Sequence, residues 1–266
     1  MGIGFLQKIW SRILNAANVG TIFVGLIPKD LNTVLGVVLE WTVNKMIKVE
    51  NIDTWGFEHA IRGMRNPLNS WDKFDSYFGY GENKCRRCTD YCDWREQNYI
   101  LGENDLGLMR KLFKAGTEHR KYLRQIFVSM DIVAPLYWWK EFDTYKVGTV
   151  ANSCSTMHKI HEEKITPDSF SFDHVILCEV GKQFLEELEK LRVKYVNTGD
   201  KKYWYALIQL LPSSYNQRRT VTMNYENAVN MIRQRENHKL DEWREFTNIL
   251  RDMPYIKPIM DGDAND

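Results

Sequence analysis

The residues best suited to chemistry lie on one expected helix in the carboxyl-terminal part of the chain. Asn224 is a suitable N-cap, and steps of three and four residues lead from it along one stripe to Arg235, with Asn230 on the flank. A guanidinium fork held there matches a phosphate, a carboxylate or the carbonyl edge of a pyrimidine. The alternative is an ordinary surface ion pair with a nearby acid such as Glu236 or Asp241.

A second group of small polar side chains lies between Asn152 and His158, in the sequence NSCSTMH. It follows a short extended run, and a turn at this point presents hydroxyls and backbone N–H groups to an anion. Asn152 and Ser155 are therefore candidate binding residues. A cofactor-free hydrolase with Ser155, His158 and Asp131 as a triad is an alternative, although no nucleophile-elbow motif accompanies them.

The elements that position these groups alternate between helix and strand. A helical pattern runs from Leu106 to Ala115, and alternating apolar residues predict a strand from Ile126 to Ile132. Pro135 suits the first turn of an aromatic-rich helix from Leu136 to about Lys146, whose aromatic stripe is typical of a core. A strand through Val221 then precedes the helix that carries Arg235.

The composition indicates an ordered globular chain with almost no net charge. The 266 residues are 44% hydrophobic and 13% aromatic, enough to bury one large core or two modest ones. Lys and Arg number 36 against 35 Asp and Glu, so the net charge of +1 creates no overall field that favours nucleic acid. We expect no nucleic-acid partner, and any phosphate binding must be local.

The cysteines favour a reducing compartment. There are five, an odd number, and no secretory signal with a cleavage site is recognisable, so a cytoplasmic location is expected. Cys85, Cys88 and Cys92 form a C-x2-C-x3-C cluster that could hold zinc or an iron–sulfur centre, but a second ligand pair is missing. The preferred interpretation is no metal, with free thiols in an irregular insertion from 79 to 102.

The first 45 residues differ in character from the rest, so a boundary is expected before Met46. Apolar residues from Phe5 to Leu14 fall on one stripe and predict an amphipathic helix. Packing on its own domain is preferred, and contact of residues 1–16 with a membrane surface or another subunit is the alternative. A natural start at Met46 is a further hypothesis. The apolar run from Val19 to Ile27 is too short to span a bilayer.

Two motifs resemble those of the flavin-dependent (ThyX-type) thymidylate synthases. Residues 211–235, LPSSYNQRRTVTMNYENAVNMIRQR, are similar without a gap to the pattern LP…T-x-N-x-R-x-L-x-N-F-x-x-x-R. Residues 134–158 resemble the A-P…R-H-R…N-E-x-S-x-R-Y segment, with one extra residue before Asn152. The resemblance extends over roughly Lys114 to Met253 and leaves out residues 1–45 and the cysteine loop.

The resemblance implies an α+β domain over residues 46–266, with a mixed sheet and flanking helices, assembled as a homotetramer with active sites between subunits. It implies conversion of dUMP to dTMP with FAD, and with NADPH and methylenetetrahydrofolate as co-substrates. The implied cofactor-binding residues are Asn224, Asn230, Tyr145 and Lys146. The implied substrate-binding residues are Asn152, Ser155, Arg218 and Arg235. The implied catalytic residues are Arg235, above the pyrimidine, and Ser155, beside the phosphate.

The sequence departs from the family pattern mainly at charged positions. Thr144-Tyr145-Lys146 replaces the Arg-His-Arg triplet, Ser153 replaces a glutamate, and Glu226 replaces a flavin-contacting arginine. Met157-His158 replaces Arg-Tyr, and Ile208 replaces a phosphate-binding arginine. Each lost charge-assisted contact costs on the order of 1.5 to 3 kcal/mol. Two hypotheses remain: a divergent synthase acting on dUMP or a related pyrimidine nucleotide, or a non-catalytic relative that binds a nucleotide or another protein.

Overall fold

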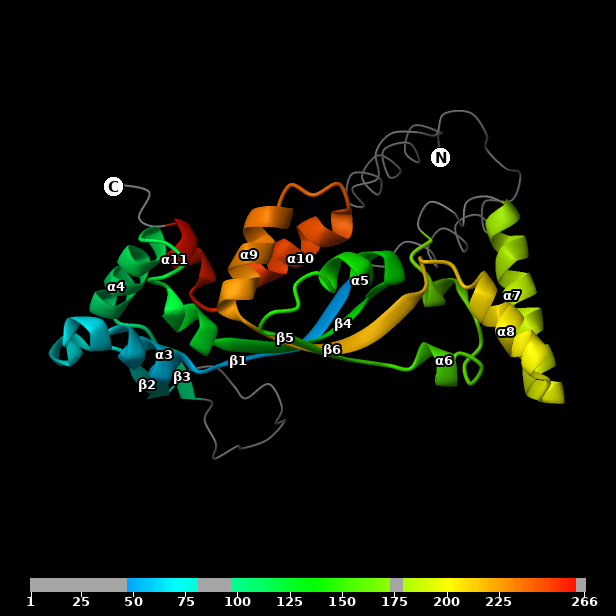
Figure 1. Cartoon of the computed structure of the whole chain (residues 1–266), viewed down its shortest axis with the longest axis horizontal. Helices are drawn as coiled ribbons and strands as arrows, with labels where there is room; N and C mark the ends of the chain where they lie inside the picture. The colour runs from blue at the N-terminus through cyan, green and yellow to red at the C-terminus, as the bar shows by residue number, and fades with distance from the viewer. Residues whose placement is uncertain (1–46, 81–96, 173–178, 262–266) are drawn as a thin grey trace, which may run out of the picture. The chain divides into compact units, whose positions relative to one another are not determined.

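The computed structural model describes residues 47–80, 97–172 and 179–261 (Figure 1). The predictions for residues 1–45 and for Cys85, Cys88 and Cys92 lie outside these ranges. Within them, no helix combines the length and the apolar character that crossing a bilayer requires.

A four-stranded sheet with the order β1-β4-β6-β5 organises the fold. Its strands are β1 (Lys48–Trp55), β4 (Phe127–Pro135), β5 (Thr149–Ser153) and β6 (Asn216–Asn224). The strands expected from Ile126 to Ile132 and through Val221 are therefore confirmed. The sheet differs in one detail from the expected mixed sheet, because each described pairing is antiparallel. Antiparallel neighbours run in opposite directions, so no parallel crossover is needed between them.

Helices cover one face of this sheet (Figure 1). They are α5 (Leu136–Phe142), α9 (Tyr225–Arg235) and α10 (Asp241–Arg251). Along β4, Val128, Met130 and Ile132 on the covered face are buried, whereas Ser129 and Asp131 on the other face are partly exposed. This alternation follows from the two-residue period of a strand, and it makes the covered face the main core.

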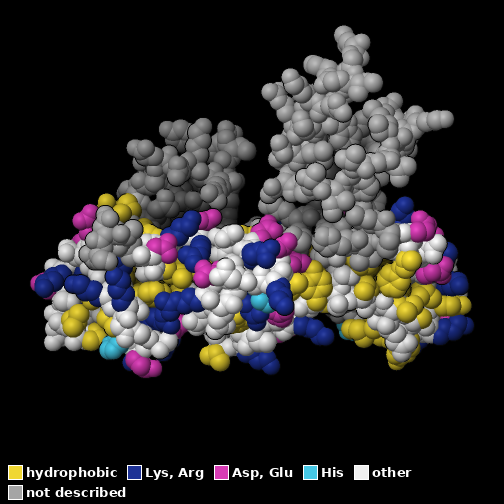
Figure 2. Space-filling view, turned by 90° about the horizontal axis from the view of Figure 1, so that it is seen from above, with side chains coloured by type: hydrophobic (Ala, Val, Ile, Leu, Met, Phe, Trp, Pro, Cys, Tyr) yellow, Lys and Arg dark blue, Asp and Glu magenta, His cyan; other side chains and the backbone are white. Residues whose placement is uncertain are grey.

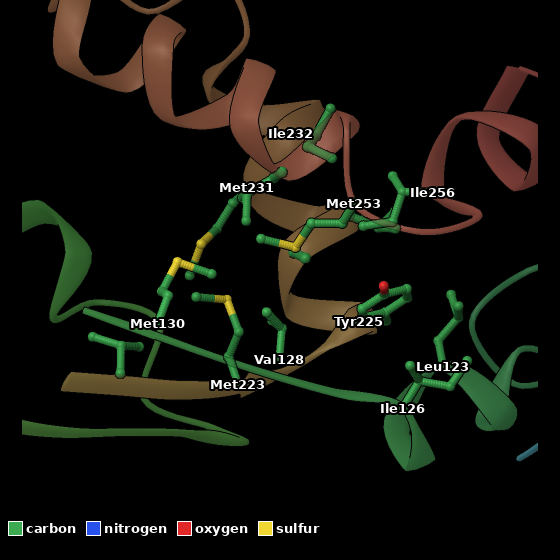
Figure 3. Close-up of a cluster of buried hydrophobic side chains, with 14 of the residues drawn as sticks. Leu123, Ile126, Val128, Met130, Met223, Tyr225, Met231, Ile232, Met253 and Ile256 are labelled. Atoms are coloured by element: carbon green, nitrogen blue, oxygen red, sulfur yellow. The ribbon is translucent and has the colours of Figure 1, made fainter. Parts of the chain in front are cut away.

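Methionines fill much of the space between the sheet and α9. Met130 of β4, Met223 of β6, Met231 of α9 and Met253 are all buried, and their side chains gather beside Val128 (Figure 3). The unbranched thioether adapts to irregular gaps between a twisted sheet and a helix.

Further elements complete the domain. The longer helices are α3 (Phe57–Met64), α4 (Glu103–Lys114), α7 (Glu179–Thr198), α8 (Lys201–Leu210) and α11 (Ile256–Asp261). The short helices are η1 (Asn66–Leu68), η2 (Trp71–Lys73), η3 (Lys121–Gln125), α6 (Thr156–Lys159) and η4 (Pro167–Ser169). The helix expected from Leu106 to Ala115 is confirmed as α4.

A second, smaller core lies where α7 and α8 pack together. Its buried residues include Phe170, Leu188 and Leu207, and Ile208 packs against them. Ile208 therefore has a packing role at the position where the resemblance implied an arginine.

Two local predictions need correction. The helix expected to reach Lys146 ends at Phe142, because the Thr144 and Tyr145 amides bond to carbonyls of the last turn and the chain leaves the helix there. The segment 79–102, expected to be irregular, begins and ends in paired strands, β2 (Tyr77–Tyr80) and β3 (Gln97–Ile100). Its aromatic and β-branched residues favour that pairing.

A buried ion pair fixes the start of α4. Asp105, fully buried, accepts the Arg65 guanidinium at 2.6 Å and the Ser76 hydroxyl and amide at 2.6 and 2.9 Å. Each carboxylate oxygen therefore has donors, which a buried charge requires.

Removal of this carboxylate is expected to destabilise the domain strongly. Asp105→Asn leaves the Arg65 charge buried without its counter-ion, and the free energy of unfolding in urea should fall by about 3–5 kcal/mol. Glu103→Gln, an exposed substitution in the same helical turn, should change it by less than about 0.5 kcal/mol. Equal effects of the two substitutions would contradict the assignment.

Candidate functional site

Arg235, the last residue of α9, is held by side chains from other parts of the chain. Its Nη1 donates to Glu141 Oε2 at 2.7 Å, and its Nε donates to the Tyr145 hydroxyl at 3.1 Å. The guanidinium also lies over the Trp243 ring, 5.0 Å from the centroid, in a cation–π geometry. The arginine is therefore positioned before any ligand binds, which reduces the ordering cost of binding.

The acid that pairs with Arg235 is distant in sequence. Glu236 and Asp241, the local partners considered from the sequence, form ion pairs with other arginines. Glu141 Oε2 instead binds Arg235 and lies 3.3 Å from His238 Nε2. The bonds to Glu141 and to the Tyr145 hydroxyl use Nη1 and Nε, so Nη2 is engaged by neither. With its charge neutralised, Arg235 is better suited to donating an oriented hydrogen bond than to attracting anions from a distance.

Asn224 has a structural role at the start of α9. Its Oδ1 accepts the Asn227 backbone N–H at 3.0 Å, so the predicted N-cap is confirmed. Gly148 lies against it with a φ of 72°, and a Cβ at that glycine would come within 2.5 Å of Asn224 Nδ2. Glycine alone tolerates both the backbone conformation and the close approach. The contact between Asn224 and a flavin stays a prediction.

Two further carboxamide side chains, besides the predicted Asn224 and Asn230, lie on the polar side of α9. Asn227 Nδ2 donates to a carbonyl and a hydroxyl in the turn of residues 147–149, at 2.6 and 2.9 Å. Gln234 Oε1 accepts the Tyr145 hydroxyl at 2.8 Å. Together with Asn230, which is partly exposed, these residues are three and four apart and share one side of the helix. That spacing was the available signal for Asn227 and Gln234, which the sequence analysis missed.

Asn152 and Ser155 lie at the far end of β5. Asn152 is exposed and pairs in register with Thr220 of β6. Ser155 is the N-cap of α6, where its Oγ accepts the His158 backbone N–H at 3.3 Å. The expected turn with small hydroxyl side chains is therefore present, and it opens a short helix.

A pocket of about 250 Å³ lies beside Ser155. Its charged lining residues are Lys159, Lys164, Glu162 and Glu163. Lys159 and Glu162 form an ion pair at 2.6 Å. The two lysines attract a phosphate and the two glutamates repel it, so the pocket has no strong net preference for an anion. The role of Ser155 beside a phosphate stays a prediction.

Within one chain, the expected site residues form separate groups. Asn224 and Arg235 lie at opposite ends of α9, an 11-residue helix that is about 16 Å long at 1.5 Å per residue. Ser155 belongs to α6, beyond β5. Among the described residues, Tyr145 and Arg235 are the pair that the structure brings into direct contact, and Lys146 is exposed nearby in sequence.

Arg218 belongs to a polar network on the uncovered face of the sheet. Its Nη2 donates to Asp131 Oδ2 at 2.7 Å, and Thr220 and Asn51 donate to the same carboxylate at 2.6 and 2.9 Å. Asn51 reaches it from a bulge in β1 with a φ of 52°, a conformation that asparagine tolerates. The hydrogen bonds from Thr220, Arg218 and Asn51 hold the pKa of Asp131 well below its usual range. Arg218 is thus paired with an acid of its own chain.

The hydrolase alternative does not fit this arrangement. The Asp131 carboxylate is bound on the sheet by Thr220, Arg218 and Asn51, and the Ser155 hydroxyl caps α6. In the described residues no contact joins this acid to His158. A triad needs the base to bridge acid and nucleophile, so the structure does not support one.

Arg219, next to Arg218, is fixed against the aromatic helix α5. Its Nη1 donates to Asp143 Oδ1 at 2.7 Å, and its guanidinium lies 4.2 Å from the centroid of the Trp139 ring. Arg219 is therefore a second arginine that an acid beside α5 holds in place, as Glu141 holds Arg235.

Glu226, where the resemblance implied an arginine, is buried and paired. Arg120 Nε lies 3.2 Å from Oε1, and Arg124 Nε lies 2.5 Å from Oε2. The hydrogen bond and charge of Glu226 raise the pKa of Arg124. Because two guanidinium groups share one carboxylate, positive charge remains at this place, but η3 and the residue before it supply it instead of α9.

The described ranges contain no cluster of metal-ligating side chains. In residues 47–80, 97–172 and 179–261, no three histidine, cysteine or acidic side chains gather as metal ligands. Cys154 is an exposed free thiol.

The described residues fit the ring system of a flavin better than its pyrophosphate. Tyr145 and the carboxamides of α9 supply aromatic surface and hydrogen-bonding groups of the kind an isoalloxazine requires. In the segment 144–146, Lys146 is the cation that is left to meet phosphate oxygens, in place of two cations in the family triplet. The fit is therefore to the heteroaromatic part of the cofactor.

Comparison with known proteins defines the fold. No protein-family model and no curated protein sequence matches the chain. A solved structure of the flavin-dependent thymidylate synthase ThyX from Helicobacter pylori, complexed with FAD and dUMP, matches with a TM-score of 0.59 at 16% identity, covering 80% of this chain and 98% of that one. Another structure of ThyX from Helicobacter pylori with FAD and dUMP gives a TM-score of 0.58 at 16% identity, over 81% and 98%. The expected α+β thymidylate synthase-like fold is confirmed.

The Asp131 network predicts a specific loss of stability in acid. The folded-state pKa of Asp131 is depressed, so its stabilising contribution is present above the usual carboxylate pKa of about 4 and is lost as the pH falls towards the folded value. Asp131→Asn should lower the melting temperature at pH 7 and flatten its decrease between pH 5 and about pH 3. The melting temperatures are measured by circular dichroism. If the melting temperatures of the variant and the wild type fall in parallel across this pH range, Asp131 does not carry the effect.

Proposed function

We propose that this chain is a divergent FAD-dependent thymidylate synthase-like enzyme that methylates dUMP or a related pyrimidine nucleotide. The observation that carries the proposal is the fixed Arg235 fork, which ends α9 in a chain with the fold of flavin-dependent thymidylate synthases. Two contacts set its direction, and Nη2 is left to donate to a pyrimidine carbonyl. Such a donor stabilises negative charge that develops on the ring.

The other residues have supporting roles in this proposal. Tyr145, Lys146, Asn224 and Asn230 hold the flavin, and Asn152, Ser155 and Arg218 hold the nucleotide. A bound reduced flavin would supply a hydride, with NADPH as its reductant and methylenetetrahydrofolate as the one-carbon donor. The cytoplasm is the proposed location.

The proposal includes a homotetramer, and the separation of these groups within one chain supports it. Asn224 and Arg235 lie about 16 Å apart along α9, and Ser155 belongs to α6, beyond β5. The sequence resemblance implies active sites between subunits. In such a site, some of the binding residues come from one copy of the chain and the rest from a second copy.

A non-catalytic binding protein is the second candidate. The specific observation in its favour is that Arg218, Arg219 and Arg235 each pair with a carboxylate at 2.7 Å. A phosphate must compete with these acids, which weakens binding of an anionic nucleotide.

The flavin content distinguishes the two candidates. The enzyme should purify as a yellow protein, or should develop protein-bound flavin absorption when FAD is added, and dUMP should perturb that spectrum because the two ligands are adjacent. The measurement is visible absorption after gel filtration of the full chain with FAD, with and without dUMP. A colourless protein that retains no flavin under these conditions favours the binding protein.

Arg235 should control turnover more than stability. Arg235→Ala should reduce the rate of dTMP formation by roughly 100-fold, the usual effect of removing one donor that stabilises developing charge. Arg244→Ala removes an exposed arginine that is paired within α10 and should leave the rate unchanged. Glu141→Gln keeps the shape but loosens the fork, so an intermediate rate is expected. Unaltered turnover in Arg235→Ala would show that Arg235 is not the donor to the pyrimidine ring.

A further inference from the structure

A second pocket, of about 320 Å³, lies between α6, α7 and α8 and has no role in the proposed function. Its aromatic lining residues are Tyr195, Trp204 and Tyr205. Two histidines and one lysine, His158, His161 and Lys201, also line it. The volume is within the range of small-molecule sites.

The aromatic walls of this pocket are fixed by their own contacts. Trp204 Nε1 donates to the Met157 carbonyl at 3.0 Å, which ties the indole of α8 to α6. The Tyr205 ring meets the indole edge-on, with centroids 4.9 Å apart, and the Tyr195 and His161 rings meet in the same way at 5.1 Å. Each ring held in this way presents its own face to a ligand without further loss of side-chain freedom.

The charge around the pocket favours an anion. No aspartate or glutamate is among its lining residues. Lys201 begins α8, and the neighbouring acid Asp200 caps the helix and pairs with Lys202 at 2.8 Å, so Lys201 is the lysine that lines the pocket. His161 Nδ1 is buried and has no partner in the described part of the chain, and a buried polar atom of this kind normally meets water or a ligand.

Exposed apolar surface adjoins the pocket. Tyr205 is 55% exposed and Met157 is 47% exposed, and hydrophobic side chains gather over α7 and α8 (Figure 2). Exposed aromatic residues beside cations are a frequent arrangement where planar rings with a negative substituent bind.

We infer that this pocket binds a planar heteroaromatic anion. The ring lies against Trp204 and Tyr205, and the anionic substituent, a carboxylate or a phosphate, is directed to Lys201 and His158. The inference does not depend on the flavin or on Arg235, so either proposal can fail alone. Two sources share this chemistry, a folate with its carboxylates and a purine nucleotide with its phosphate.

Isothermal titration calorimetry of the full chain with folic acid and, separately, with AMP tests the inference. At least one of the two probes should bind. Tyr205→Ala should weaken that binding by about fivefold or more, the effect of removing one stacking partner. The matched control Tyr203→Ala alters an aromatic residue of the same helix that is outside the pocket lining.

A second matched pair tests the charge. Lys201→Gln should weaken the binding probe several-fold and reduce its salt dependence, whereas Lys202→Gln, which alters the next residue and a partner of Asp200, should not. Binding of folic acid alone or of AMP alone identifies the anion, and it supports the inference where Tyr205→Ala and Lys201→Gln weaken it, because a folate bound at the proposed active site would not respond to them. The inference is overturned if neither probe binds at millimolar concentration, or if the control substitutions weaken binding as much as the pocket substitutions.

An interface between copies of the chain is the competing use of this surface. Sedimentation velocity of Tyr205→Ala and of the wild-type chain separates the two. An unchanged oligomeric state together with weakened binding supports the ligand site. A loss of the oligomer with unchanged binding of the probe assigns the surface to subunit contact and overturns the inference.

Discussion

The burial of one aromatic helix face is the constraint on which the rest of the candidate site depends. Trp138, Trp139 and Phe142 of α5 are almost fully buried, and Trp138 packs on Trp243 of α10 with centroids 4.8 Å apart. This packing leaves α5 no freedom to rotate, because a large ring at each buried position would have to move. The polar residues on and after α5 therefore have set directions.

Those directions decide what the arginines can do. Glu141 of α5 meets Arg235 of α9, and Asp143, just after α5, meets Arg219 of β6. Each pair links α5, or the residue just after it, to an element far away in sequence. The carboxylate orients the guanidinium group and also neutralises its charge. The same principle acts at Glu226, where Arg120 and Arg124 enclose a buried carboxylate. At the position where the resemblance implied an arginine, the cations therefore come from another element.

These pairs bear on both functional candidates. Neutralised arginines attract phosphate weakly, but a guanidinium that is already oriented gives directional hydrogen bonds to a neutral heterocycle. The aromatic pocket between α6, α7 and α8 shares no lining residue with the second core and has its own cations. The two proposed ligand sites are therefore chemically distinct, one organised by α5 and one by α8.

Local patterns in the sequence determined much of the secondary structure. The alternation in β4, the N-cap at Asn224 and the aromatic core face of α5 were predictable because each depends on residues close together in the chain. The partners of Arg235, Arg218 and Glu226 were not predictable, because Glu141, Asp131 and Arg120 lie 94, 87 and 106 residues away from them, respectively. Long-range ion pairs depend on which faces pack together, and only the tertiary structure decided that.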